Sequence, residues 1–141
     1  MRDLLLSIYL RVKEMPLLLR FFFIVSICGI FFALFSVIPI SSYQIDGQEA
    51  TYQEWWSSGV GLAATAIGIL LFISGIGIYK KKNWAKFTFL SSFLISFLSD
   101  YILPQKGMIF ILTFWTLFCV WYLFIKKSVR NYFLSEAKTQ E

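Results

Sequence analysis

Two stretches without a charged residue, 21–40 and 60–79, constrain the fold more than any other feature of this sequence. A helix of about 20 apolar residues is long enough to cross the hydrocarbon core of a bilayer, which is about 30 Å thick. Residues 108–125 form a third uncharged run, and residues 87–103 form a fourth that contains one acid, Asp100. The sequence therefore predicts an all-α membrane protein, with four transmembrane helices and short loops in a single domain.

The composition supports the same fold class. Of the 141 residues, 58% are hydrophobic and only 15% are charged, whereas soluble domains carry about 45–50% apolar and about 25% charged residues. So few polar side chains do not cover a water-exposed surface. A soluble globular domain and a disordered chain are therefore both excluded.

The basic residues predict how the four helices are oriented. The segment before residue 21, the loop at 80–86 and the segment after residue 125 carry four each, which leaves Lys106 alone in the other two loops. Because Lys and Arg are enriched in cytoplasmic loops, we expect both termini in the cytoplasm and residues 41–58 outside, in an inner (plasma) membrane. The net charge of +5 then reflects topology and contacts with membrane lipids, and no nucleic-acid partner is expected.

Two segments flank the predicted helices on the cytoplasmic side. Residues 3–15 place polar and apolar side chains on opposite faces at helical spacing, which predicts an amphipathic helix lying in the membrane interface. A surface anchor and a docking site for a partner are the two roles open to it. Residues 126–141 are expected to form a cytoplasmic tail.

The external loop 41–58 contains two local folding signals. Asp46-Gly47 favours a tight hairpin turn. Thr51 and Glu54 have the spacing of a capping box, in which each side chain pairs with an amide at a helix start. We therefore expect the second spanning helix to begin at this box, outside the membrane.

Aromatic side chains follow directly after that helix start. Tyr52, Trp55 and Trp56 lie where the helix enters the membrane, and tryptophan and tyrosine are enriched at both membrane–water interfaces. An interfacial belt is one interpretation of these residues. An aromatic surface that grips an external partner is the other.

The second predicted span has the clearest packing signal. Gly61, Ala64, Gly68 and Gly75 fall on one face of a helix, and small residues let two helix backbones approach closely in lipid. The stripe predicts a packed interface, either inside the four-helix bundle or with another protein.

The third predicted span carries a line of polar side chains: Thr88, Ser92, Ser96, Ser99 and Asp100. Hydroxyls in a membrane helix can donate to carbonyls of their own preceding turn and then need no other partner. The alternative is a polar path between helices, with Asp100, the one ionisable group inside these spans, at its outer mouth.

The side chains used in catalysis are scarce. The chain has no histidine and two cysteines, Cys28 and Cys119, both placed within predicted spans. Serine–histidine–aspartate triads, zinc sites and phosphate-binding loops lack their residues. We expect no catalytic residue, no bound metal and no cofactor, and hence no enzyme.

Two functions agree with these features. The first is a non-catalytic membrane protein that acts by protein–protein contact in the bilayer, as an accessory subunit of a complex or as an immunity protein against a membrane-acting toxin. The second is a small oligomeric channel or transporter that uses the hydroxyl line and Asp100. The expected partners are another membrane protein, a toxin or a second copy of the chain.

Overall fold

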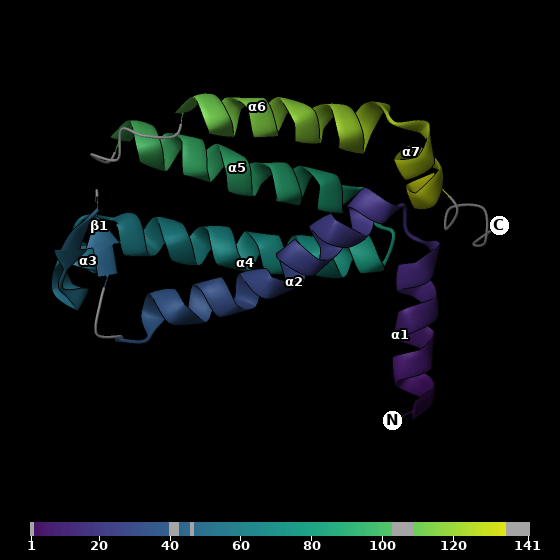
Figure 1. The fold of residues 1–141 in the computed structure, drawn as a ribbon, viewed down its shortest axis with the longest axis horizontal. Helices are drawn as coiled ribbons and strands as arrows, with labels where there is room; N and C mark the ends of the chain where they lie inside the picture. The colour runs from purple at the N-terminus through teal and green to yellow at the C-terminus, as the bar shows by residue number, and fades with distance from the viewer. Residues whose placement is uncertain (1, 40–42, 46, 103–108, 135–141) are drawn as a thin grey trace.

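The computed structural model describes residues 2–39, 43–45, 47–102 and 109–134, with the backbone alone described at 2–5, 7, 99–102 and 109–112. The fold is predominantly helical, as predicted (Figure 1). In chain order its elements are α1 (Arg2–Glu14), α2 (Leu17–Val37), β1 (Tyr43–Ile45), β2 (Gln48–Ala50), α3 (Tyr52–Ser57), α4 (Val60–Tyr79), α5 (Trp84–Ile102), α6 (Ile109–Val120), the π-helical turn η1 (Trp121–Ile125) and α7 (Lys127–Leu134).

Among the described residues, α2 and α4 are long and apolar enough to cross a membrane. Two further stretches, Trp84–Leu98 and Thr113–Ile125, are apolar helices of shorter length. The bounds of α4 equal the predicted run 60–79, but α2 begins and ends earlier than the predicted run 21–40. It ends at Val37 because Ile38, with φ −77° and ψ 128°, is extended, as the residue before a proline usually is.

The long helices form a row. Helix α2 packs on α4, α4 packs on α5, and α5 packs on α6, with the closest association between α2 and α4. Figure 1 shows these four helices running along the long axis of the molecule, while α1 projects across it. We call the end with α1, the α4–α5 turn and α7 the basic end, and the end with β1, β2 and α3 the hairpin end.

The seam between α2 and α4 follows a heptad spacing. The buried residues of α2 recur at alternating intervals of three and four: Leu19, Phe22, Ser26, Gly29, Ala33 and Ser36. On α4 the same spacing relates its buried Gly61, Ala64, Gly68, Gly75 and Ile78. Such a spacing keeps one narrow face of each helix against its neighbour, and the small side chains bring the backbones close together.

The largest apolar core lies at the basic end. It joins α2, α4, α5, η1 and α7 through Leu19, Phe22, Ile78, Ala85, Phe89, Tyr122, Leu123, Val129, Tyr132 and Phe133. The ring of Phe22 lies 5.1 Å from that of Phe89 and 5.4 Å from that of Tyr122. These contacts tie α2 to α5 and η1.

Residues 127–134 form a helix where the sequence analysis expected only a tail. Val129, Tyr132 and Phe133 of α7 are buried, and they occupy one face because they are spaced at i, i+3 and i+4. The preceding π turn, η1, is a wide turn of i→i+5 type. It contains the buried Tyr122 and Leu123, and Lys126 after it is extended, which starts the new helix.

The hairpin end confirms both local predictions. Strands β1 and β2 pair antiparallel, with Ile45 opposite Gln48, and Gly47 in the turn has a φ of +77° that favours glycine. The capping box of Thr51 and Glu54 is present. However, the expected continuous helix from this box was wrong, because α3 ends at Ser57 and Gly59, with a φ of +82°, separates it from α4.

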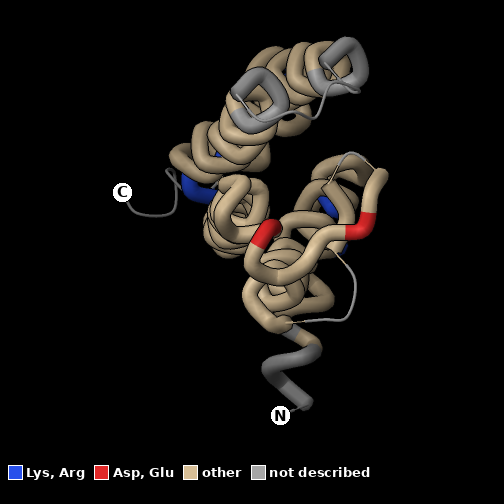
Figure 2. Tube along the Cα trace, turned by 90° about the vertical axis from the view of Figure 1, so that its left-hand side faces the viewer, with Lys and Arg blue, Asp and Glu red and all other residues tan. Residues whose placement is uncertain are grey.

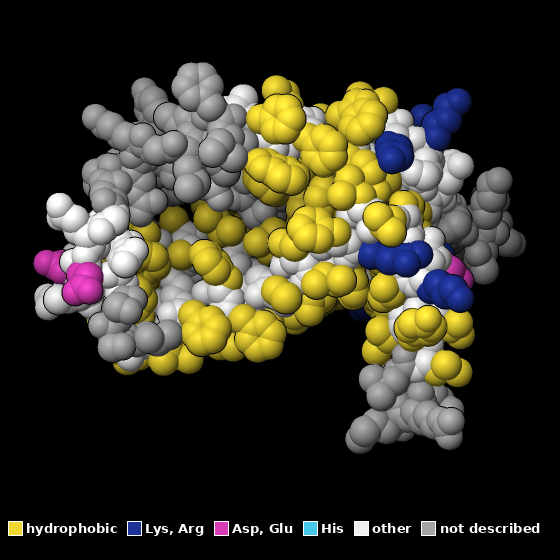
Figure 3. All heavy atoms as spheres, viewed as in Figure 1, with side chains coloured by type: hydrophobic (Ala, Val, Ile, Leu, Met, Phe, Trp, Pro, Cys, Tyr) yellow, Lys and Arg dark blue, Asp and Glu magenta, His cyan; other side chains and the backbone are white. Residues whose placement is uncertain are grey.

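Charge divides the molecule along its long axis. In Figure 3 the visible Lys and Arg side chains gather at the basic end, and most visible acidic side chains lie at the hairpin end. Figure 2 looks along the helices from the hairpin end, with its acidic residues in front. Between the two ends, the surface of the long helices is largely hydrophobic (Figure 3).

Candidate functional site

The small-residue stripe on α4 packs against other helices of the same chain. A Cβ atom added at Gly68 would lie 2.7 Å from the backbone nitrogen of Ala33, and one added at Gly75 would lie 3.0 Å from Cβ of Ser26. One added at Gly61 would lie 2.7 Å from the ring of Trp55. Ala64 is buried as well. This face therefore packs against α2 and α3 and offers little open surface.

Three serine hydroxyls on α2 and α4 are buried, and they differ in whether they have a hydrogen-bond partner. Ser36 Oγ donates to the carbonyl of Gly61 at 3.1 Å, which links α2 to α4. Ser26 Oγ on α2 and Ser74 Oγ on α4 are buried too, and neither has a hydrogen-bond partner among the described residues. Of these hydroxyls, that of Ser36 joins α2 to α4 through a hydrogen bond, and those of Ser26 and Ser74 do not.

The aromatic side chains of the hairpin end hold the β1–α3 segment against the end of α2. The ring of Trp55 stacks on that of Tyr43 at 5.0 Å, and its Nε1 donates to Ser36 Oγ at 3.4 Å. Tyr52 donates its hydroxyl to the carbonyl of Val37 at 3.1 Å. Trp55 and Trp56 are half-buried and Tyr52 is exposed, so of these three Tyr52 presents the most surface to a partner.

Glu54 has a structural role at this end. Its carboxylate accepts from the backbone nitrogen and the hydroxyl of Thr51, each at 2.8 Å. These two hydrogen bonds, the backbone one first, hold the pKa of Glu54 below its ordinary value. The carboxylate is thereby engaged in capping α3.

Three hydroxyls of the predicted polar line donate to carbonyls of their own helix, α5. Thr88 donates to the carbonyl of Trp84 at 3.2 Å, and Ser92 donates to that of Phe89 at 2.6 Å. Ser96 donates to the carbonyl of Ser92 at 3.1 Å. The side chains of Ser99 and Asp100, the other members of the predicted line, lie outside the described residues.

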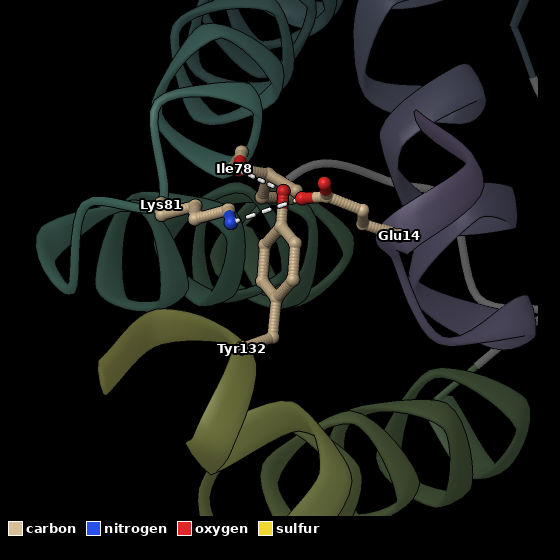
Figure 4. Close-up of polar contacts among 4 residues, drawn as sticks. All are labelled: Glu14, Ile78, Lys81 and Tyr132. Carbon is tan, nitrogen blue, oxygen red and sulfur yellow. Dashed lines mark hydrogen bonds and ion pairs between the residues drawn. The ribbon is translucent and has the colours of Figure 1, made fainter. Parts of the chain in front are cut away.

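A polar joint at the basic end connects three parts of the chain (Figure 4). Lys81, in the α4–α5 turn, pairs with Glu14 of α1 at 3.2 Å between Nζ and Oε2. The same ammonium lies 5.0 Å from the ring centre of Tyr132 on α7. Tyr132 in turn donates its hydroxyl to the carbonyl of Ile78 at 3.2 Å. The joint therefore fixes α1 and α7 to the same turn.

Lys86 is a second cation held under α7. It is only 8% exposed, and its ammonium lies 4.4 Å from the ring centre of Phe133 and 5.8 Å from that of Phe124. Sequence reasoning missed this arrangement because it took residues 126–141 for a tail.

The described residues contain no group of three or more metal-ligating side chains. Both cysteines are free thiols, with Cys28 exposed on α2 and Cys119 buried on α6. Comparison with protein-family models, curated proteins and solved structures gives no match to this chain.

Proposed function

We propose that this chain is a small non-catalytic protein of the inner membrane that acts by protein–protein contact within the bilayer. Four helices cross the membrane: α2, α4, α5, and α6 continued by η1. Both termini are cytoplasmic, so the basic end faces the cytoplasm and the hairpin end faces outward. An accessory subunit of a membrane complex and an immunity protein against a membrane-acting toxin are the two roles of this kind.

The observation that carries the proposal is the open edge of the helix row at α6. Helix α6 packs mainly on α5, and its Phe114, Leu117 and the following Trp121 are 70%, 65% and 48% exposed. Aromatic side chains are enriched in protein interfaces, and Trp is among the residues that contribute most to binding energy. A partner helix placed beside α6 would extend the row by the same kind of packing.

The α2–α4 seam supports placing the partner at α6 rather than at the small-residue stripe. A partner helix at the stripe would have to displace α2, whose backbone atoms lie within van der Waals reach of Gly68. Docking at α6 displaces no described contact. The proposal therefore assigns the stripe to the stability of the chain and the aromatic edge to partner binding.

Site-specific photo-crosslinking in native membranes tests this proposal. A photoreactive phenylalanine analogue at Phe114 should give one discrete protein adduct, identifiable by mass spectrometry. The matched control is the same substitution at Phe31 on α2, which is also exposed but lies at the opposite edge of the row. An adduct of twice the chain mass would identify a second copy as the partner.

Two outcomes would contradict the proposal. The first is no protein adduct at Phe114, or the same set of adducts at both sites, which would indicate chance collisions in the membrane. The second is substrate-selective flux through proteoliposomes that is lost in Asp100→Asn. That result would favour a channel or transporter using the hydroxyl line of α5.

A further inference from the structure

The basic end contains a hollow that the protein–protein role does not use. It measures about 620 Å³ and lies between the end of α1, the first turn of α2, the α4–α5 turn and α7. Its polar lining comes from Lys13, Glu14, Arg20, Lys81, Ser128 and Tyr132. Small-molecule sites in proteins have volumes of about 300–1,000 Å³, so the hollow is large enough for a ligand.

The charges around the hollow favour an anion. Lys13, Arg20 and Lys81 line it together with one carboxylate, Glu14, which gives three positive charges against one negative charge. Glu14 is engaged with Lys81 at 3.2 Å, so no carboxylate among the described residues pairs with the other two cations. Cations from three separate segments of the chain therefore converge on one space.

Two backbone carbonyls fix the position of the Arg20 guanidinium beside the hollow. Its Nε donates to the carbonyl of Met15 at 2.9 Å, and its Nη2 donates to the carbonyl of Lys13 at 2.6 Å. A guanidinium has five N–H donors, so these two bonds fix its plane and leave further donors. A fixed planar donor group of this kind suits the paired oxygens of a phosphate.

In the proposed topology, the hollow lies at the depth of the lipid headgroups. Arg20 lies in the first turn of α2, where that helix enters the bilayer in the proposed topology. Helix α1 projects across the long helices (Figure 1) with Leu6, Tyr9 and Leu10 exposed, as expected of a helix that lies in the interface. The hollow is therefore at the corner between an in-plane helix and a spanning helix.

We infer that this hollow binds the phosphate group of an acidic phospholipid headgroup. Lys13 and Arg20 contact the phosphate, and Lys81 lies at the rim of the hollow. The inference rests on the proposed membrane topology, because that topology brings headgroups to the basic end. An acidic headgroup binds here in preference to a zwitterionic one because it leaves a net negative charge to meet the cations.

The test uses the full chain in neutral detergent micelles, titrated with phosphatidylglycerol or phosphatidylcholine, with bound lipid counted by native mass spectrometry. The wild type should retain phosphatidylglycerol preferentially. Lys13→Gln and Arg20→Gln should each weaken that retention about fivefold, the effect of about 1 kcal/mol per basic side chain near a lipid surface. Lys127→Gln is the matched control, since Lys127 is a basic residue at the same end that does not line the hollow.

Two variants separate binding from folding. The side chain of Lys13 is exposed, so Lys13→Gln should leave the thermal unfolding midpoint unchanged while it weakens lipid retention. Arg20→Lys keeps the charge but loses the planar donor group, and it should fall between wild type and Arg20→Gln. Adding inorganic phosphate assigns the source of the ligand: displacement of lipid points to free phosphate, and retention of lipid points to the headgroup.

The inference would be overturned if the wild type held both lipids equally, or if Lys127→Gln weakened retention as much as Lys13→Gln. Alkaline extraction of membranes, carried out on the same variants, reports whether the chain is integrated. A chain that resists extraction but does not discriminate between lipids contradicts this site alone. A chain that is extracted contradicts the proposed topology as well.

Discussion

At the scale of single residues, glycine has its clearest role where α2 and α4 cross. Cβ atoms added at Gly29 and Gly68 would each lie 2.7 Å from backbone atoms of the opposite helix. Backbone cannot move aside as the end of a flexible side chain can. The two positions therefore set the distance between the helices.

We expect Gly68→Ala to lower the free energy of unfolding by about 1–3 kcal/mol, the usual cost of overpacking. Enlarging the neighbouring Ile69 to Phe should cost much less, because Ile69 is 45% exposed and lies off the seam. Reversible unfolding in mixed micelles, followed by circular dichroism, measures both. Equal stability of Gly68→Ala and wild type would mean that the helices are not in close contact at this point.

The seam hydroxyls give a matched pair of serine substitutions. Ser36→Ala removes a hydrogen bond to Gly61 and one from Trp55, and it should destabilise the fold by about 0.5–1.5 kcal/mol. Ser26→Ala removes a buried hydroxyl with no described partner, so it should be neutral or stabilising. The same unfolding assay compares them, and a larger loss for Ser26→Ala would reverse the assignment.

At the scale of elements, the sequence predicts those parts whose signals are local. The turn at Asp46-Gly47 and the capping box of Thr51 and Glu54 need only neighbouring residues, and both were predicted correctly. The break at Gly59 was missed because this glycine directly precedes the apolar run 60–79 and resembles the packing glycines within that run. Only its φ of +82° separates it from them.

Helix α7 was missed for a different reason. Its apolar residues Val129, Tyr132 and Phe133 are few, and the basic residues around them suggested a tail. Their spacing does fit one helical face, but three apolar residues predict a packed helix only when the core they pack against is known. That core is assembled from distant segments, including Phe89 and Ile78, which local patterns do not bring together.

Two adjacent residues test the contribution of α7. Phe133 is 2% exposed and Leu134 is 42% exposed. We expect Phe133→Ala to destabilise the protein by about 3–5 kcal/mol, as for other buried phenylalanines, and Leu134→Ala to have little effect. Thermal unfolding in detergent distinguishes them, and similar midpoints for the two variants would show that α7 does not complete the core.

Acid should release the cap of α3. Because the folded-state pKa of Glu54 lies below its ordinary value of 4.5, the capping box contributes stability above that value and loses it as the pH falls through the lowered pKa. Amide hydrogen exchange in α3 should therefore accelerate in this acidic range. Glu54→Gln should exchange faster at neutral pH and show less dependence on acid; an unchanged pH profile in that variant would assign the effect to another group.

At the scale of the whole molecule, the division of charge between the two ends gives a direct test of topology. Cysteines introduced at Gln48, in β2, and at Asn83, in the α4–α5 turn, occupy opposite ends and are both exposed. In intact cells an impermeant thiol reagent should label Gln48→Cys and not Asn83→Cys, while both should react after the membrane is permeabilised. Labelling of the Asn83 site in intact cells would reverse the orientation.

The position of α7 in the chain has a consequence for biosynthesis. Each long helix packs on the one synthesised before it, so α2, α4, α5 and α6 can associate in order as they leave the ribosome. The core at the basic end closes only when Val129, Tyr132 and Phe133 arrive, and until then Lys86 lacks the ring of Phe133 that lies against its ammonium. A nascent chain that stalls before α7 would therefore display an incomplete core at the basic end, open to recognition by proteases.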